Sequence, residues 1–439
     1  MTPRYVQLLK DVALPPVALV RQTFAVTEAG DVAAAVHRAM AKESCTAAIR
    51  PGMRIALTVG SRGLASLPQL VAAIVAEIRA RGGEPFVIPA MGSHGGATAE
   101  GQVKMLAHLG VTEASAGCPI RSSMETVNIG TLDNGMEVHV DKLAYEADGI
   151  VVFNRVKPHT EFRGDNESGL IKMLAIGLGK QSGADNCHAW GSGYLARSIV
   201  EMGQMKLDRC KILFGVATLE NAYDRLARVV VLPAEGMIAR ERPLLAEAMR
   251  NMPRLPLGPP DGLQASGPLD VLVLDQVGKE FSGSGMDPNI TGRVSTPAIS
   301  GGPEVSRIAV LDVSDHSEGN AVGIGIADVI TQRLFDKFDR EPTYINCITL
   351  GTLTMAGLPM TMPSDEWAIR AAVKSCASHT PEAITLIRAP NSLHLQYLYV
   401  SDTLLPSLRE RPGIEILGAP KPMAFDAAGN LLDPWPERH

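Results

Sequence analysis

The stretch Gly149–Gly191, GIVVFNRVKPHTEFRGDNESGLIKMLAIGLGKQSGADNCHAWG, indicates how the chain is organised. Its first apolar residues, 150–153, have the length and composition of a short buried strand. The loop that follows holds His159, and the apolar segment after that loop holds Lys172. In parallel α/β sheets, loops at the carboxyl ends of strands carry ligand sites. We therefore expect residues that bind a ligand or act in catalysis in this loop and in its neighbours.

Lys172 lies among apolar residues in the sequence GLIKMLAIG. Burial of an amine in such a setting lowers its pKa and makes it a better nucleophile. A lysine at the start of a helix can also reach solvent along its aliphatic stem. The residues alone leave both interpretations open.

Outside this stretch, strands and helices alternate, which predicts an α/β fold with parallel sheets and right-handed crossovers. The first half has strands at 54–59, 85–89, 150–153 and 211–216, and helices at 31–49, 67–81 and 99–108. The second half has strands at 269–274, 308–313, 345–350, 384–387 and 395–400, and a helix at 320–338. A Pro- and Gly-rich segment, 255–267, separates the halves. We predict two α/β domains, 1–260 and 268–439, with mainly parallel sheets and an interdomain cleft.

Composition excludes several classes of protein. The chain has 439 residues, 46% hydrophobic content and a formal net charge of −6, so it has a sizeable core and no basic surface for nucleic acid or anionic membrane. Its six cysteines are far apart and form no CxxC pair, which favours a reducing, cytoplasmic setting. The N-terminus is interrupted by Asp11 and two prolines, so we predict neither a signal peptide nor an anchor. Self-association is compatible with these features.

Three polar residues follow predicted strands. Arg62 suits a bidentate clamp on a carboxylate, and His94, in GSHGGAT, suits acid–base work or metal binding. His159 follows the strand 150–153. Because parallel strands end at the same edge of a sheet, we expect the three side chains to converge. Arg62 as a surface residue and His94 as a turn residue are the alternatives.

Gln276 and Lys279 follow the first strand of the second half, in DQVGKE. Their spacing would direct an amide and an ammonium into one cleft, and the glycine-rich loop after them favours a functional role. No metal motif can be defended from spacing, since HExxH and zinc-type Cys/His pairs are missing from the sequence.

Five features of the sequence, in this order, resemble the motifs of the nickel-dependent lactate racemase family: GSHGGAT, KPH, SGLIK, His188 and QVGK. The resemblance covers roughly residues 54–293. The resemblance implies a nickel-pincer nucleotide attached through a thioamide to Lys172, with His188 as the nickel ligand. It also implies cofactor-synthesis proteins as partners. It further implies that two histidines act in acid–base catalysis, His94 and His159. Three residues would bind the substrate: Arg62, Gln276 and Lys279.

The sequence departs from the family pattern at Val59, at Ile171 and in a longer loop before Lys172. That loop adds Arg163, Asp165, Asn166 and Glu167, which would suit a substrate with more hydroxyl groups. We therefore predict a racemase or epimerase that inverts C2 of a 2-hydroxy acid larger or more polar than lactate, such as a sugar acid. Two alternatives stay open. One is a lyase or aldolase that forms a Schiff base at Lys172, and the other is a non-catalytic two-lobed sensor of sugar acids.

Overall fold

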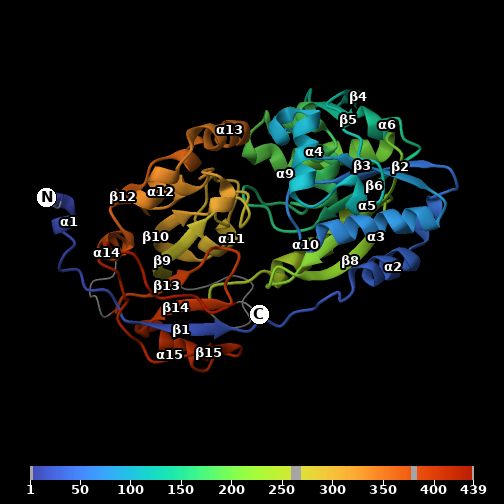
Figure 1. The fold of residues 1–439 in the computed structure, drawn as a ribbon. Coiled ribbons are helices and arrows are strands. Elements are labelled where there is room, and N and C mark those ends of the chain that lie inside the picture. Colours follow the sequence, from blue (N-terminus) through green and yellow to red (C-terminus); the bar gives the residue numbers. More distant parts are fainter. Residues whose placement is uncertain (1–2, 259–267, 377–382, 438–439) are drawn as a thin grey trace. The chain divides into compact units, whose positions relative to one another are not determined.

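The computed structural model describes residues 3–258, 268–376 and 383–437, and the chain divides into two compact α/β units (Figure 1). Unit 1 comprises Met1–Ala25 and Pro253–His439, and unit 2 comprises Val26–Met252. The first 25 residues therefore depart from the predicted domain 1–260, because strand β1 (Val17–Gln22) pairs with two strands of the C-terminal half. Of the predicted linker 255–267, residues 259–267 lie outside the described part of the chain.

Unit 2 is built on a five-stranded sheet with the order β3-β2-β6-β7-β8. The first four strands are parallel and β8 is antiparallel to β7, so the sheet is mainly parallel as predicted. Its strands are β2 (Arg54–Val59), β3 (Glu84–Pro89), β6 (Gly149–Arg155), β7 (Ile212–Glu220) and β8 (Leu226–Pro233), and β4 (Thr126–Thr131) and β5 (Glu137–Asp141) form a separate ribbon.

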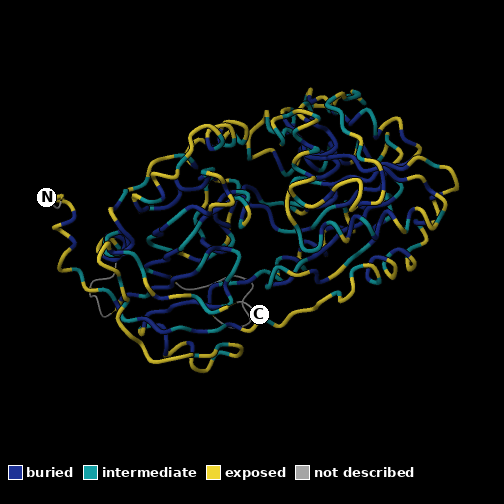
Figure 2. Tube along the Cα trace, in the orientation of Figure 1, coloured by how far each residue is buried: buried dark blue, intermediate teal, exposed yellow. Residues whose placement is uncertain are grey.

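Helices cover both faces of this sheet, and its inner strands β2, β6 and β7 consist mostly of buried residues, which are dark blue in Figure 2. Alternate residues such as Leu57, Val151 and Val216 pack in a core with α3. On the other face, α7 and α10 meet β7: a Cβ on Gly215 would lie 2.5 Å from a methyl of Leu170. Strands buried on both faces are expected for a parallel sheet. The helices of unit 2 are α2 (Val32–Lys42), α3 (Leu67–Ala80), α4 (Ala99–His108), α5 (Glu113–Ala116), α6 (Lys142–Tyr145), α7 (Leu170–Lys172), α8 (Lys180–His188), α9 (Ser192–Arg209) and α10 (Met237–Asn251), with short turns η1 (Ser44–Ala48), η2 (Gly95–Ala97) and the π-helical turn η3 (Met173–Gly177).

Unit 1 contains an eight-stranded sheet with the order β12-β11-β10-β9-β13-β14-β1-β15. Strands β12 to β13 are parallel, and the last three pairings are antiparallel. Its other strands are β9 (Pro268–Val277), β10 (Glu304–Val313), β11 (Val329–Thr331), β12 (Met360–Met362), β13 (Leu386–Ala389), β14 (Tyr397–Ser401) and β15 (Ile414–Ile416). Its helices are α1 (Arg4–Gln7), α11 (Pro288–Thr291), α12 (Gln332–Lys337), α13 (Arg340–Leu350), α14 (Asp365–Ser375) and α15 (Leu405–Leu408), with short turns η4 (Asp315–Ser317), η5 (Ile324–Ile326), η6 (Leu353–Ala356) and η8 (Asp402–Leu404).

Two predicted elements of the second half are wrong. Residues 345–350 belong to helix α13 and not to a strand, because Asp339 caps the helix start and the buried Thr343 and Cys347 are one helical turn apart. The predicted helix 320–338 is formed only over α12, since residues 329–331 pair with β10 as strand β11. None of the helices in the described residues has the length and apolar character to span a membrane.

Candidate functional site

Three neighbouring parallel strands of unit 2, β3, β2 and β6, end at one edge of the sheet, and each is followed by a predicted site residue. Arg62 follows β2, His94 follows β3 and His159 follows β6. The loop after β3 lies against η3, where Gly92 has a φ of +60° and an added Cβ would be 3.2 Å from Ile176. The topology therefore places these loops beside the segment that bears Lys172.

Lys172 contacts His159 directly, with 2.5 Å between Lys172 Nζ and His159 Nε2. On the other side of the ring, His159 Nδ1 accepts a hydrogen bond of 3.1 Å from the amide of Glu161. An imidazole that accepts at Nδ1 carries its proton on Nε2, and an Nε2–H can only donate to an unprotonated amine. The contacts therefore describe a neutral imidazole facing a neutral, nucleophilic lysine.

The surroundings of this pair shift both side chains toward their neutral forms. Burial lowers the pKa of Lys172 to about 8; the charge of Glu161 opposes this shift and that of Arg62 adds to it. Burial, followed by the charges of Lys172 and Lys157, holds the pKa of His159 well below its usual value. Arg62 and Glu161 are thus close enough to Lys172 to change its ionisation.

His94 is exposed, and its Nδ1 lies 2.5 Å from the hydroxyl of Ser61, the residue before Arg62. A buried network holds the backbone of its loop. Gln102 Nε2 donates to the carbonyl oxygens of Gly92 and His94 at 2.9 and 3.2 Å. Lys180 Nζ in turn donates to Gln102 Oε1 at 2.9 Å and pairs with Asp141 at 3.1 Å, and both charged side chains are fully buried.

His188 is the last residue of α8. Burial, and then the charge of Lys172, lower its pKa to about 4, so its imidazole is neutral near pH 7 and offers a lone pair. The adjacent Cys187 is buried, which raises the pKa of its thiol to about 12 and keeps it protonated. Within the described residues, no three His, Cys, Asp or Glu side chains form a group able to hold a metal. Because its imidazole has a free lone pair and the thiol of Cys187 keeps its proton, His188 is the better metal ligand of the two.

The long loop before Lys172 uses its extra polar side chains largely within unit 2. Glu167, which is buried, accepts hydrogen bonds from the amides of His159 and Gly164 at 2.6 and 3.2 Å. Arg163 donates to the His159 carbonyl at 3.0 Å, and Asp165 pairs with Arg242 at 3.1 Å. These polar side chains therefore bind other groups of the protein, so their presence in the loop gives little support for contacts with substrate hydroxyl groups.

Gln276 and Lys279 belong to unit 1, at the carboxyl end of β9. Lys279 Nζ donates to the carbonyl of Gly283 at 2.9 Å and to Asn346 Oδ1 at 2.7 Å, so it also has a local role in holding its loop.

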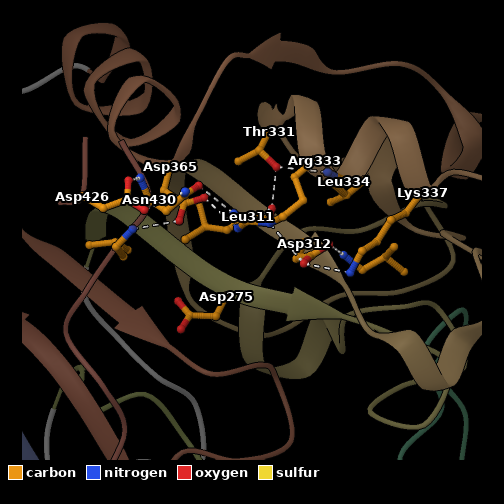
Figure 3. A network of polar contacts seen from close by, with 12 residues as sticks. Asp275, Leu311, Asp312, Thr331, Arg333, Leu334, Lys337, Asp365, Asp426 and Asn430 are labelled. Carbon is orange, nitrogen blue, oxygen red and sulfur yellow. Dashed lines mark hydrogen bonds and ion pairs between the residues drawn. The ribbon is translucent and has the colours of Figure 1, made fainter. Parts of the chain in front are cut away.

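A cavity of about 480 Å³ lies next to Gln276, at the carboxyl ends of β9, β10 and β13. Charged side chains that line this cavity form ion pairs with one another. Arg333 donates to Asp312 and Asp365 at 3.2 and 2.8 Å (Figure 3), and Arg388 binds Asp275 through two nitrogens, each at 2.7 Å.

Sequence reasoning missed two buried charges next to Lys172. Glu241 of α10 and Lys206 of α9 contact the backbone on either side of it. A signal was present: each lies at helical spacing with buried apolar residues of its own helix, as Lys206 does with Ile199 and Met202. Charged residues on an apolar helix face are rare unless paired.

Comparison with known proteins gives one family. Residues 11–189 match the lactate racemase N-terminal domain. Among solved structures, the lactate racemase apoprotein from Thermoanaerobacterium thermosaccharolyticum is similar with a TM-score of 0.46 and 13% sequence identity, over 86% of this chain and 93% of that one. No curated protein sequence matches the chain.

Proposed function

We propose that the chain is an isomerase of the lactate racemase family, which inverts C2 of a 2-hydroxy acid with a nickel-pincer nucleotide attached to Lys172. The observation that carries this proposal is the contact between the Lys172 amine and His159. The family match covers residues 11–189, which include Arg62, His94, His159, Lys172 and His188.

The residues present fit such a cofactor. Formation of a thioamide needs an unprotonated amine, and with a pKa of about 8 Lys172 supplies that form much more readily than an ordinary lysine. A nickel ligand needs a neutral imidazole, and His188 has one near pH 7. When bound, the group supplies an acceptor for hydride from C2, which is needed because the C2 proton of a hydroxy acid is weakly acidic.

The chain's own residues would handle the proton of the substrate hydroxyl. We propose that His159 and His94 each serve one enantiomer, taking this proton as the planar keto acid forms and returning it afterwards. With the cofactor attached, the nitrogen of Lys172 would be part of a thioamide and would carry no charge. Its repulsion of a protonated His159 is then removed, which raises the pKa of His159 toward the range that acid–base catalysis requires.

For the substrate we propose a carboxylate bound by Arg62. The roles expected for Gln276 and Lys279, which belong to unit 1, stay predictions. Support for a substrate more polar than lactate now comes from Glu161, which is buried and whose charge acts on both Lys172 and Arg62. An acidic group at this place favours an additional hydroxyl over a methyl, as in a sugar acid.

The experiment is intact mass and nickel analysis of the chain produced together with cofactor-synthesis proteins. We expect bound nickel and an adduct on the peptide that contains Lys172, and Lys172→Arg should carry no adduct. A panel of 2-hydroxy acids, followed by the chirality of the product, identifies the substrate. A loaded protein that inverts no 2-hydroxy acid, or a protein without any adduct, would contradict the proposal.

The alternative of a Schiff-base lyase is tested on the same residue. Borohydride reduction in the presence of keto acids would then leave a substrate-derived mass on Lys172. A sensor would bind sugar acids without turnover, and the variants His94→Asn and His159→Asn would bind them equally well.

A further inference from the structure

Lys172 lies in a short, irregular and buried segment of the chain. Helix α7 has three residues, and the π-helical turn η3 follows it directly. A π turn replaces the regular hydrogen bonds of an α-helix by longer ones, and such turns are frequent at functional sites. The position of the amine therefore depends on what holds the backbone groups at the two ends of 170–177.

Glu241 holds the amide end of this segment. Its carboxylate accepts hydrogen bonds from the amides of Leu170 and Ile171, and its other oxygen accepts one of 3.1 Å from Asn166. The side chain is 1% exposed. The fit leaves no room at Gly169, where an added Cβ would lie 2.4 Å from a carboxylate oxygen.

Lys206 holds the carbonyl end. Its ammonium nitrogen is fully buried and donates to the carbonyl oxygens of Leu174 and Ala175 at 2.7 and 3.1 Å. An acceptor at the amide end and a donor at the carbonyl end satisfy backbone groups that a short helical segment leaves unpaired.

These two burials are costly. Charged side chains in a protein interior are weak contributors to stability, and well-packed apolar residues often do as well or better. Glu241 and Lys206 come from different helices, and the hydrogen bonds above direct both of them to the backbone of one short segment. Their common effect is the placement of that segment.

We propose that Glu241 and Lys206 are positioning residues, which together hold the turn 170–177 so that the Lys172 amine stays on His159. This inference rests on the proposed role of Lys172 as the point of cofactor attachment. Neither residue touches the amine. They act through the backbone on both sides of it.

The test uses the full chain produced without cofactor-synthesis proteins, so that Lys172 is free. The protein is treated at pH 8 with a small acetylating ester, and peptide mass spectrometry gives the acetylation of Lys172 relative to the exposed Lys104. An amine with a pKa of about 8 is half unprotonated there, whereas an ordinary lysine is only about 0.4% unprotonated. Release of the turn into solvent would therefore lower the ratio.

We expect Glu241→Leu and Lys206→Met to lower this ratio about tenfold or more. Glu241→Gln should retain most of it, because an amide oxygen can accept from the same two backbone amides. Hydrogen exchange of the peptide spanning 170–177 should rise in the two loss variants. The matched controls are Glu247→Gln on α10 and Arg197→Met on α9, whose side chains pair with Arg228 and Glu201 instead.

An unchanged ratio and unchanged exchange in folded Glu241→Leu would overturn the inference, as would equal losses in both control variants. Should Glu241→Leu fail to fold, Gly169→Ala displaces the carboxylate without removing it and is expected to give the same loss. The outcome is separable from that of the proposed function. A wild-type chain that never acquires a cofactor adduct contradicts the function alone, whatever the labelling shows.

Discussion

Glu241 should make the stability of unit 2 depend on pH, and Glu241→Gln should remove that dependence. Burial raises the pKa of this carboxyl from 4.5 to about 7, against the opposing hydrogen bonds from Asn166 and the two amides. The folded state therefore binds the proton more tightly than the unfolded state. The stability that Glu241 contributes is full below pH 4.5 and is lost as the pH rises through about 7.

The magnitude follows from the two pKa values. A shift of one unit corresponds to about 1.4 kcal/mol, so a carboxyl with values of 4.5 and about 7 loses about 2–3 kcal/mol of stabilising free energy between pH 5 and pH 8. Glutamine does not titrate. The difference in unfolding free energy between Glu241→Gln and wild type should thus shift by about 2–3 kcal/mol in favour of the variant over this range.

The assay is urea denaturation at the two pH values, with a saturating pulse of thiol reagent to report unfolding of unit 2. Cys118 and Cys187 are free, buried thiols of this unit and react only when it opens. Glu247→Gln, on the same helix but partly exposed and paired with Arg228, is the control and should shift stability equally at both pH values. An equal difference at pH 5 and pH 8 for Glu241→Gln would refute the reasoning.

Three further predictions concern the same unit. Acetylation of wild-type Lys172 followed against pH should have its midpoint near pH 8, and a midpoint near that of an ordinary lysine would contradict the burial argument. Lys180→Met leaves the buried Asp141 without its ion-pair partner and should cost about 3–5 kcal/mol, measured by the same urea assay, with partial recovery on adding Asp141→Asn. His188→Ala should reduce bound nickel strongly while the Lys172 adduct persists in the mass spectrum, whereas unchanged nickel content would remove His188 as the ligand.

The parts of the fold that follow local periodicity were predictable. Strand β2 and helix α4 have the predicted bounds, because the spacing of apolar residues along a short segment indicates whether it forms a strand or a helix. The order β3-β2-β6 also follows the expectation that Arg62, His94 and His159 end at one edge of a sheet. By contrast, the strand predicted at 345–350 failed, because a short apolar run has no period of its own and the cap at Asp339 decided the outcome.

The α/β class and the parallel sheets follow from the sequence alone, since they depend on residue types at fixed spacings along the chain. The groups that act on Lys172 follow only from the way the helices pack in three dimensions. Its amine meets an imidazole 13 residues away, and its turn is held by charges that come 34 and 69 residues later. Contacts between helices that are distant in sequence depend on how they pack on the sheet. Burial, which sets the ionisation of Lys172, Glu241 and Lys206, arises only from that packing.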